Sequence, residues 1–250
     1  MSSPSGCTSF WDHLDELRTR LIRVIVAVVL FAVVAFLLKN VLFDIILAPC
    51  KSDFLIYQLI GAPPFSIHLI NTGLTEQFMA HMRVSMYAGL LTASPYIIYE
   101  LFGFVSPGLY VNERRYAVLI GGTAYVMFLL GTVLNYFVIF PLTVRFLGTY
   151  QVSADVANML SLQSYIDTLI VMSFVMGVVF ELPVVCGMMG RMGLINASMM
   201  SNYRRHAIVA ILILAAIITP TTDVFTLFIV AIPIWMLYEV SIWVVKVRIL

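Results

Sequence analysis

The sequence predicts an all-α, polytopic integral membrane protein, with residues 1–250 forming a single domain of six transmembrane helices. Hydrophobic residues make up 62% of the chain and charged residues only 11%, whereas a soluble domain carries about 25% charged residues. The hydrophobic residues gather in six runs, at about residues 21–38, 84–105, 116–140, 165–189, 206–218 and 224–245. A spanning helix needs about 17–25 apolar residues, so five runs are long enough. The fifth run, 206–218, would cross only where the bilayer is thin.

The distribution of Lys and Arg predicts the orientation of these runs. If the N-terminus is cytoplasmic and six helices cross, ten of the fourteen basic residues fall on the cytoplasmic side. The other four are Lys39, Lys51, Arg83 and Arg145. The positive-inside rule therefore places both termini in the cytoplasm.

The segments between and before the runs also carry patterns. Residues 9–21 have apolar side chains at helical spacing and predict a short amphipathic helix at the cytoplasmic surface. Residues 40–75 and 142–162 are expected to cap the bundle on the outer side. The stretch 94–115 is rich in Pro, Tyr and Phe, which indicates a rigid recognition surface between the second and third runs. Its aromatic floor and neighbouring carboxylates would suit an extended peptide that carries arginines.

Sequence signals of catalysis are missing. The chain contains no HExxH motif, no GxSxG motif and no P-loop lysine. Its three cysteines, Cys7, Cys50 and Cys186, lie far apart and form no metal-binding pattern. The net charge is +1 without a long basic stripe, so nucleic-acid binding is not expected. We therefore expect no enzyme activity, no cofactor, no metal and no nucleic-acid partner.

Ionisable residues inside membrane runs cost at least about 2.5–3.5 kcal/mol each and need a reason. Glu181 lies inside the fourth run, immediately before Leu182 and Pro183. It is either a functional carboxylate facing a polar cavity or a protonated side chain near carbonyl groups that Pro183 leaves unbonded. Asp167 is expected to be a solvated acid near a helix start, and Asp223 to cap the sixth run.

Three acids at the cytoplasmic interface allow two interpretations each. Glu16 could bind a ligand or pair with Arg20, four residues further along the helix. Glu113 could do the same or form a loop ion pair with the two arginines that follow it. Glu100 ends the second run and is equally ambiguous.

Several motifs together resemble the TatC family, the multispanning subunit of the twin-arginine protein translocase. They cover nearly the whole chain in order: HLDELRTRL at 13–21, EQF at 76–78, FVSPGLY at 104–110 with ERR at 113–115, Gly131 through Pro141, FELP at 180–183, Thr219-Pro220, Asp223, Pro233, and Tyr238-Glu239.

The resemblance implies a concave cup of six helices, the fifth and sixth short, in the bacterial inner (plasma) membrane. Such a protein binds twin-arginine signal peptides of folded precursor proteins and associates with copies of itself. It works with the single-span subunits TatA and TatB in export driven by the proton-motive force. By motif position, the implied signal-peptide residues are Glu16, Glu113, Phe104, Pro95 and Arg18. The implied in-membrane contacts for a partner helix are Glu181, Thr219, Pro220 and Asp223.

The sequence departs from the family pattern at two places. It has Tyr99-Glu100-Leu101-Phe102 where many members carry Tyr-Gln-x-Trp, so Glu100 adds an acid that could be a third arginine partner. Leu227 stands where many members carry Gln in the sixth run.

A proton-coupled small-solute transporter that uses Glu181 and Asp167 is the alternative function. The size of the chain favours a receptor that builds a passage jointly with partners. Six helices packed about 8–10 Å apart cannot enclose a folded protein.

Overall fold

The computed structural model describes residues 10–61, 63–65, 67–105, 114–151, 153, 158–219 and 223–247. Within them the chain is mostly helical, as predicted, with two strands of two residues each. It divides into two compact units, one built from Met1–Leu38 and Ser85–Tyr125 and the other from Lys39–Val84 and Val126–Leu250. Helices α4 and α5 contribute to both units, so each unit joins segments that lie far apart in the sequence.

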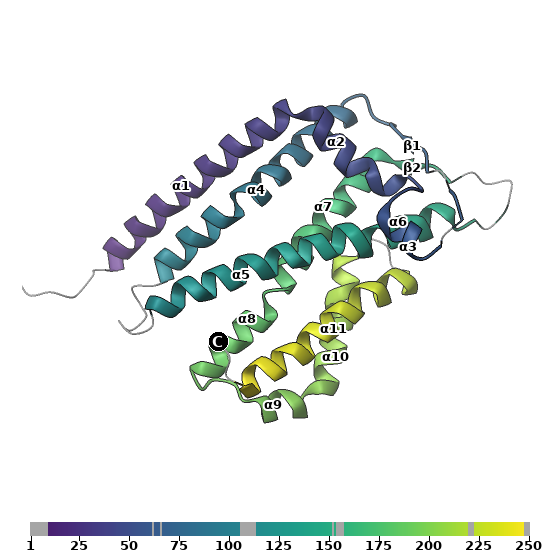
Figure 1. The fold of residues 1–250 in the computed structure, drawn as a ribbon. Helices are drawn as coiled ribbons and strands as arrows, with labels where there is room; N and C mark the ends of the chain where they lie inside the picture. The colour runs from purple at the N-terminus through teal and green to yellow at the C-terminus, as the bar shows by residue number, and fades with distance from the viewer. Residues whose placement is uncertain are drawn as a thin grey trace, which may run out of the picture. The chain divides into compact units, whose positions relative to one another are not determined.

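The first unit pairs helix α1 (Phe10–Leu37) with the C-terminal part of α4 (Glu76–Val105). The two helices run side by side in Figure 1. A β-carbon built on Gly89 of α4 would lie 2.6 Å from the backbone nitrogen of Ala32 in α1, so only glycine permits this contact. Residues 9–21 and 21–38 were expected to be separate elements, but α1 is one continuous helix, and it contains neither Gly nor Pro to break it.

Helix α4 contains residues 94–105, the first part of the stretch that is expected to form a rigid recognition surface. Pro95 lies inside this helix and cannot donate a backbone hydrogen bond to the carbonyl of Leu91. The hydroxyl of Ser94 donates to that carbonyl instead, at 2.6 Å. This local replacement lets the helix pass Pro95 and reach Val105, which is also the end of the predicted run 84–105.

The second unit contains the main hydrophobic core. Helix α5 (Arg114–Leu134) continues through a π-helical turn (η3, Asn135–Ile139) into α6 (Phe140–Thr149). Helix α7 (Leu162–Val179) packs closely on α5, because a β-carbon on Gly131 would lie 2.5 Å from the carbonyl oxygen of Met176. A break at residues 180–181 separates α7 from α8 (Leu182–Arg191).

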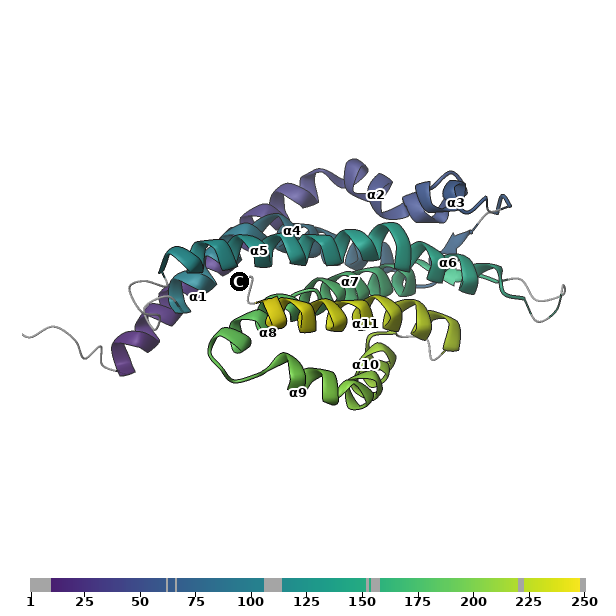
Figure 2. The same ribbon diagram turned by 60° about the horizontal axis from the view of Figure 1, so that its bottom comes forward.

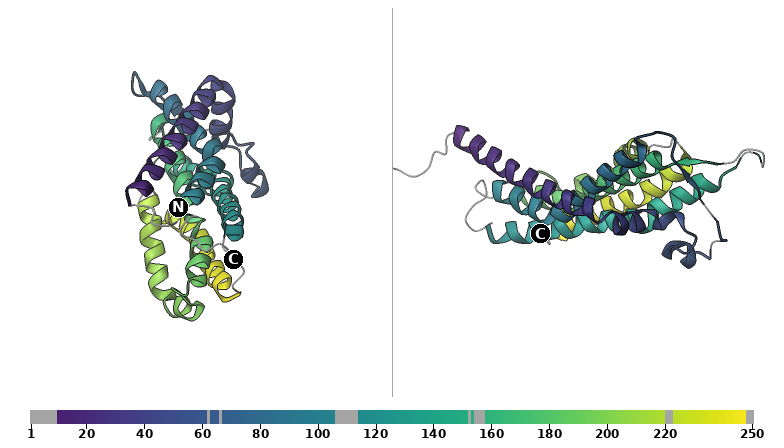
Figure 3. Two further views of the ribbon diagram at one scale, coloured as in Figure 1. Left: turned by 90° about the vertical axis from the view of Figure 1, so that its left-hand side faces the viewer. Right: turned by 90° about the horizontal axis from the view of Figure 1, so that it is seen from above.

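The C-terminal helices complete the second unit. Helix α9 (Ala197–Asn202) links α8 to α10 (Arg204–Ile218), and α11 (Val224–Val247) packs on both α8 and α10 (Figure 2). The same helices are seen from two further sides in Figure 3, in green and yellow. Two polar contacts hold the turn at α9. Tyr238 donates to the carbonyl of Met200 at 2.8 Å, and Arg204 pairs with Glu239 at 2.8 Å.

The segment 39–75 folds into short elements, namely α2 (Lys39–Leu47), a 3₁₀ turn (η1, Ala48–Cys50), α3 (Leu55–Leu59) and strand β1 (Leu69–Ile70). Strand β1 pairs in parallel with β2 (Leu160–Ser161). Three tyrosine hydroxyls fix these elements to the helices. Tyr136 donates to Ile45, Tyr165 donates to Ile46, and Tyr57 lies within hydrogen-bond distance of the carbonyls of Pro49 and Pro141.

The carboxylate of Glu76, at the start of α4, joins residues 72–73 to residues 161–163. One oxygen accepts from the backbone N–H groups of Thr72 and Gly73, and the other accepts from Ser161 and Gln163. These bonds lower the pKa of Glu76 from its usual 4.5 to about 2, the N–H of Gly73 contributing most. The ionised carboxylate of Glu76 therefore holds these two segments together.

Four helical segments in the described part of the chain are long and apolar enough to cross a membrane: Leu14–Leu37, Ile120–Thr149, Leu162–Arg191 and Val224–Val247. The other two predicted runs lie in α4, where polar and aromatic residues interrupt the apolar side chains, and in α10. Helix α10 has 15 residues and is about 22 Å long, less than the hydrocarbon core of about 30 Å.

Candidate functional site

A cluster of charged side chains joins α1 to the C-terminal end of α4. Arg20 on α1 donates through Nε and Nη2 to Oε1 of Glu16, at 3.0 and 2.7 Å. Its Nη1 donates to Oε2 of Glu100 on α4, at 2.9 Å, and to the main-chain oxygen of the same residue at 3.3 Å. One guanidinium therefore bridges two carboxylates that lie 84 positions apart in the sequence.

Neighbouring residues shape this cluster. The Tyr96 hydroxyl donates to Oε1 of Glu100 at 2.9 Å, and Nη1 of Arg23 lies 3.8 Å from the same oxygen. A β-carbon on Gly103 would clash with Nη1 of Arg20, so the missing side chain leaves room for the guanidinium. The Glu100 side chain is only 6% exposed, whereas Glu16 is 36% exposed. Glu16 is thus the carboxylate of this pair that water and solutes can reach.

The structure describes four of the five residues expected to bind a signal peptide. Glu16 is partly exposed and Arg18 is exposed on α1. Pro95 is exposed on α4, and Phe104 lies partly buried near its C-terminal end. Glu113 lies outside the described residues.

The sequence indicated one half of the charged cluster. The spacing of Glu16 and Arg20 suggested an ion pair, and the structure contains it. Glu100 was considered a partner for an arginine, and the arginine it binds here is Arg20 of the same chain. The contact between α1 and α4 that creates this pair has no signal in local spacing, because the two residues lie 80 positions apart.

The expected in-membrane residues lie in the second unit. Glu181 is partly buried in the break between α7 and α8. Thr219 is buried at the end of α10, and its hydroxyl donates to the carbonyl of Ala215 at 2.9 Å. Asp223 accepts from the backbone N–H of Thr226 at 2.7 Å and so caps α11, as expected. Pro220 lies outside the described residues.

Asp167 is not simply a solvated acid. Nη1 of Arg83, on α4, donates to both carboxylate oxygens of Asp167 on α7, one of them at 2.6 Å. Both side chains are partly exposed, and the pair joins the N-terminal parts of α4 and α7 within the second unit.

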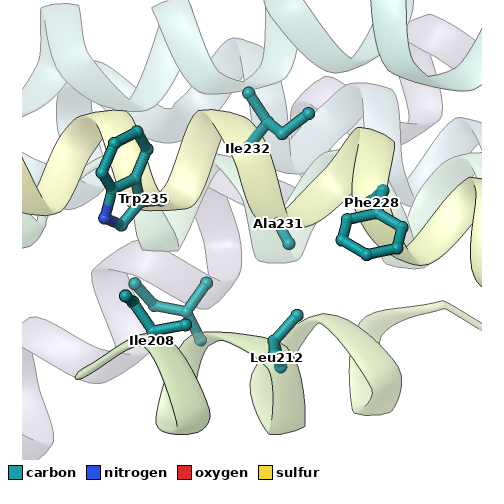
Figure 4. A pocket seen from close by; sticks show the side chains of 7 residues that line it. Ile208, Leu212, Phe228, Ala231, Ile232 and Trp235 are labelled. Atoms are coloured by element: carbon teal, nitrogen blue, oxygen red, sulfur yellow. The ribbon is translucent and has the colours of Figure 1, made fainter. Parts of the chain in front are cut away.

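An apolar hollow of about 270 Å³ lies between α10 and α11. Ile208 and Leu212 of α10 face Phe228 and Trp235 of α11 across it (Figure 4). Its wall offers almost no polar atoms, so it suits a hydrocarbon chain or an apolar helix face.

A buried polar contact escaped the sequence reasoning. The Asn135 amide, in the π-helical turn, donates to the hydroxyl of Ser173 on α7 at 2.8 Å, and both side chains are buried. Interhelical hydrogen bonds of this kind stabilise membrane bundles. Among the described residues, no three His, Cys, Asp or Glu side chains gather closely enough to hold a metal ion.

The long apolar helices and the charged cluster at one helix end define a polytopic helical membrane protein. The profile of the family described as Sec-independent protein translocase protein (TatC) matches residues 12–233. The chain belongs to the TatC family, which confirms the resemblance found in its motifs.

Relatives and solved structures agree with this assignment. The TatC protein of Desulforapulum autotrophicum is 37% identical over 242 residues, covering 97% of this chain and 86% of that protein. The TatC protein of Deinococcus radiodurans is 34% identical over 232 residues, covering 93% and 83%. A crystal structure of the twin arginine translocase receptor TatC is 31% identical, with a TM-score of 0.76, and the match covers 94% of this chain and 99% of that one.

Proposed function

We propose that this chain is the receptor subunit of a twin-arginine translocase and that it binds the signal peptides of folded precursor proteins at the cytoplasmic membrane face. The observation that carries the proposal is a pair of carboxylates, Glu16 on α1 and Glu100 near the C-terminal end of α4. Both already accept hydrogen bonds from one guanidinium group. Family membership and the likeness to a solved receptor structure support it.

We further propose that six helices span the bacterial inner membrane with both termini in the cytoplasm. The excess of Lys and Arg on that side supports the orientation. Helix α4 would be the second span and α10 the fifth, the latter in a thinned bilayer. A bundle of this size has no room for a folded cargo, so the passage would be built with single-span TatA-like and TatB-like subunits and further copies of this chain.

The proposed partner surface lies on the second unit. Glu181, Thr219, Pro220 and Asp223 would supply polar contacts to a partner helix within the membrane. The apolar hollow between α10 and α11 would receive apolar side chains of such a helix. Leu227 in place of the usual Gln would make this contact less polar than in many family members.

The proposed peptide site consists of Glu16 and Glu113 as ligands for the two arginines and Glu100 as a third acceptor, with Arg18, Pro95 and Phe104 shaping the surface around them. Charge-assisted hydrogen bonds contribute about 1.5–3 kcal/mol each. Replacing both acids, in Glu16→Ala with Glu113→Ala, should therefore weaken binding of a twin-arginine peptide at least a hundredfold, by about 3–6 kcal/mol.

The test is a titration of the purified protein in detergent with a fluorescent twin-arginine peptide. The control variant combines Asp44→Asn and Asp53→Asn, which removes two exposed acids expected on the outer side. This control should bind like the parent protein. An unchanged affinity in the Glu16 and Glu113 double variant would refute the assignment of these ligands.

A further inference from the structure

Two arginine acceptors of the proposed receptor site, Glu16 and Glu100, are already occupied by an arginine of the chain itself. Three nitrogens of the Arg20 guanidinium make four hydrogen bonds, two to Glu16 and two to Glu100, between 2.7 and 3.3 Å. Three of these bonds end on carboxylate oxygens and are the charge-assisted contacts that an incoming arginine would need, and the fourth ends on the main-chain oxygen of Glu100.

The charges of the cluster also favour an exchange of arginines. Glu16 faces Arg20, and Glu100 faces both Arg20 and Arg23, so each carboxylate already has a guanidinium group beside it. A peptide arginine that bound Glu16 or Glu100 without any rearrangement would bring a third guanidinium group to these two carboxylates. Like charges at such distances repel each other, so an exchange is favoured over an addition.

We propose that Arg20 is an internal occupant of the signal-peptide site, and that an arginine of the incoming peptide displaces it from Glu16 and Glu100. The proposal rests on the receptor function proposed above and assigns Arg20 a role in specificity. A peptide arginine can reproduce all the bonds that Arg20 gives up. A peptide lysine cannot, because its ammonium group lacks the planar fork, so displacement by lysine loses hydrogen bonds.

The surroundings of Arg20 allow it to leave. Its side chain is 23% exposed, and its pairing with Glu16 lies along one helix, so its departure breaks no backbone hydrogen bond of α1. Glu100 is 6% exposed but keeps the Tyr96 hydroxyl at 2.9 Å and has Arg23 within 3.8 Å. The space above Gly103 would take either guanidinium.

The first test compares peptide affinities of the full chain in detergent and of its Arg20→Gln variant. Arg205→Gln is the matched control, since Arg205 is also exposed and expected on the cytoplasmic side. Because the competitor is removed, Arg20→Gln should bind an Arg-Arg peptide about tenfold more tightly and bind a Lys-Lys peptide measurably. The control should match the parent protein, which should bind only the Arg-Arg peptide.

Two negative outcomes have different meanings. If the parent protein does not bind the Arg-Arg peptide, the receptor function itself is wrong. If the parent protein binds the Arg-Arg peptide and a folded Arg20→Gln variant binds it equally or more weakly, the displacement is refuted. Arg20 would then be a fixed structural partner of Glu16 and Glu100.

A second test uses the unmodified protein and so does not depend on the folding of a variant. A short pulse of phenylglyoxal, which modifies accessible guanidinium groups, is followed by mass spectrometry of the segment that contains Arg20. Saturation with the Arg-Arg peptide should raise the modification rate of Arg20 severalfold and leave that of Arg205 unchanged, and the Lys-Lys peptide should have no effect. An Arg20 rate that is unchanged or lower with bound Arg-Arg peptide would overturn the proposal.

Discussion

Replacing Gly89 with alanine should destabilise the protein, although alanine is the better helix former. A β-carbon at this position would lie 2.6, 2.7 and 2.8 Å from the backbone nitrogen, the α-carbon and the β-carbon of Ala32. Two of these atoms belong to the backbone of α1, so no side-chain rotation can relieve the overlap, and the helices must separate by about 1 Å to reach ordinary contact distances. Overpacking of this kind costs about 1–3 kcal/mol, while the exchange of glycine for alanine in a helix contributes about 0.5–1 kcal/mol.

The expected net loss for Gly89→Ala is about 0.5–2 kcal/mol, or about 1–8 °C in Tm for a chain of this length. Thermal unfolding of the purified protein in detergent measures it. Gly122→Ala is the matched control, because Gly122 also lies in a helix, α5, and a β-carbon there would meet nothing within 4 Å. The control should keep or raise the Tm. If Gly89→Ala unfolds at the same temperature as the control or higher, α1 and α4 do not meet at Gly89 as described.

Two further predictions concern Glu76 and Tyr57. The carboxylate of Glu76 has a pKa lowered to about 2, chiefly by the N–H groups of Gly73 and Gln163, so it stabilises the fold above its usual pKa of 4.5 and loses this effect as the pH falls toward 2. Glu76→Gln should therefore lower the Tm at pH 7, and its difference in Tm from the parent protein should shrink between pH 4.5 and 2.5. A difference in Tm that is constant over this range would contradict the stabilising role of the ionised carboxylate. Tyr57→Phe should lower the free energy of unfolding by about 1–2 kcal/mol, because the buried hydroxyl lies 2.8–2.9 Å from two proline carbonyls. The control Tyr150→Phe, at an exposed position, should leave the Tm unchanged. Equal unfolding temperatures for the two variants would contradict this prediction.

The positions of the helices could be predicted well where composition alone determines them. Helices α10 and α11 begin and end within two residues of the expected runs, because charged or turn-forming residues bound each apolar stretch. The continuity of α1 could also have been predicted from the absence of Gly and Pro in it. The run 84–105 predicted that α4 passes Pro95, but it did not predict that the hydroxyl of Ser94 replaces the missing backbone hydrogen bond.

The candidate site was predictable only in part. Family motifs and the four-residue spacing drew attention to Glu16 and Arg20, and burial cost drew attention to Glu181. The pairing of Arg20 with Glu100 depends on a close helix crossing at Gly89 and on the space left by Gly103. Such tertiary contacts join residues 80 positions apart, and a single sequence carries no pattern at that separation.

The central claim is that two carboxylates of this chain, Glu16 and Glu113, bind the neighbouring arginines of an incoming signal peptide. The most direct test places a photoreactive amino acid beside the ligands, at position 112 and in a second variant at position 17, so that Glu113 and Glu16 stay in place, and adds a precursor protein with an Arg-Arg leader to the full chain in membrane vesicles. We expect both positions to cross-link to residues beside the arginine pair, and the yield to collapse when Lys-Lys replaces Arg-Arg. Cross-links of equal yield with both leaders, or from neither position, would contradict the account.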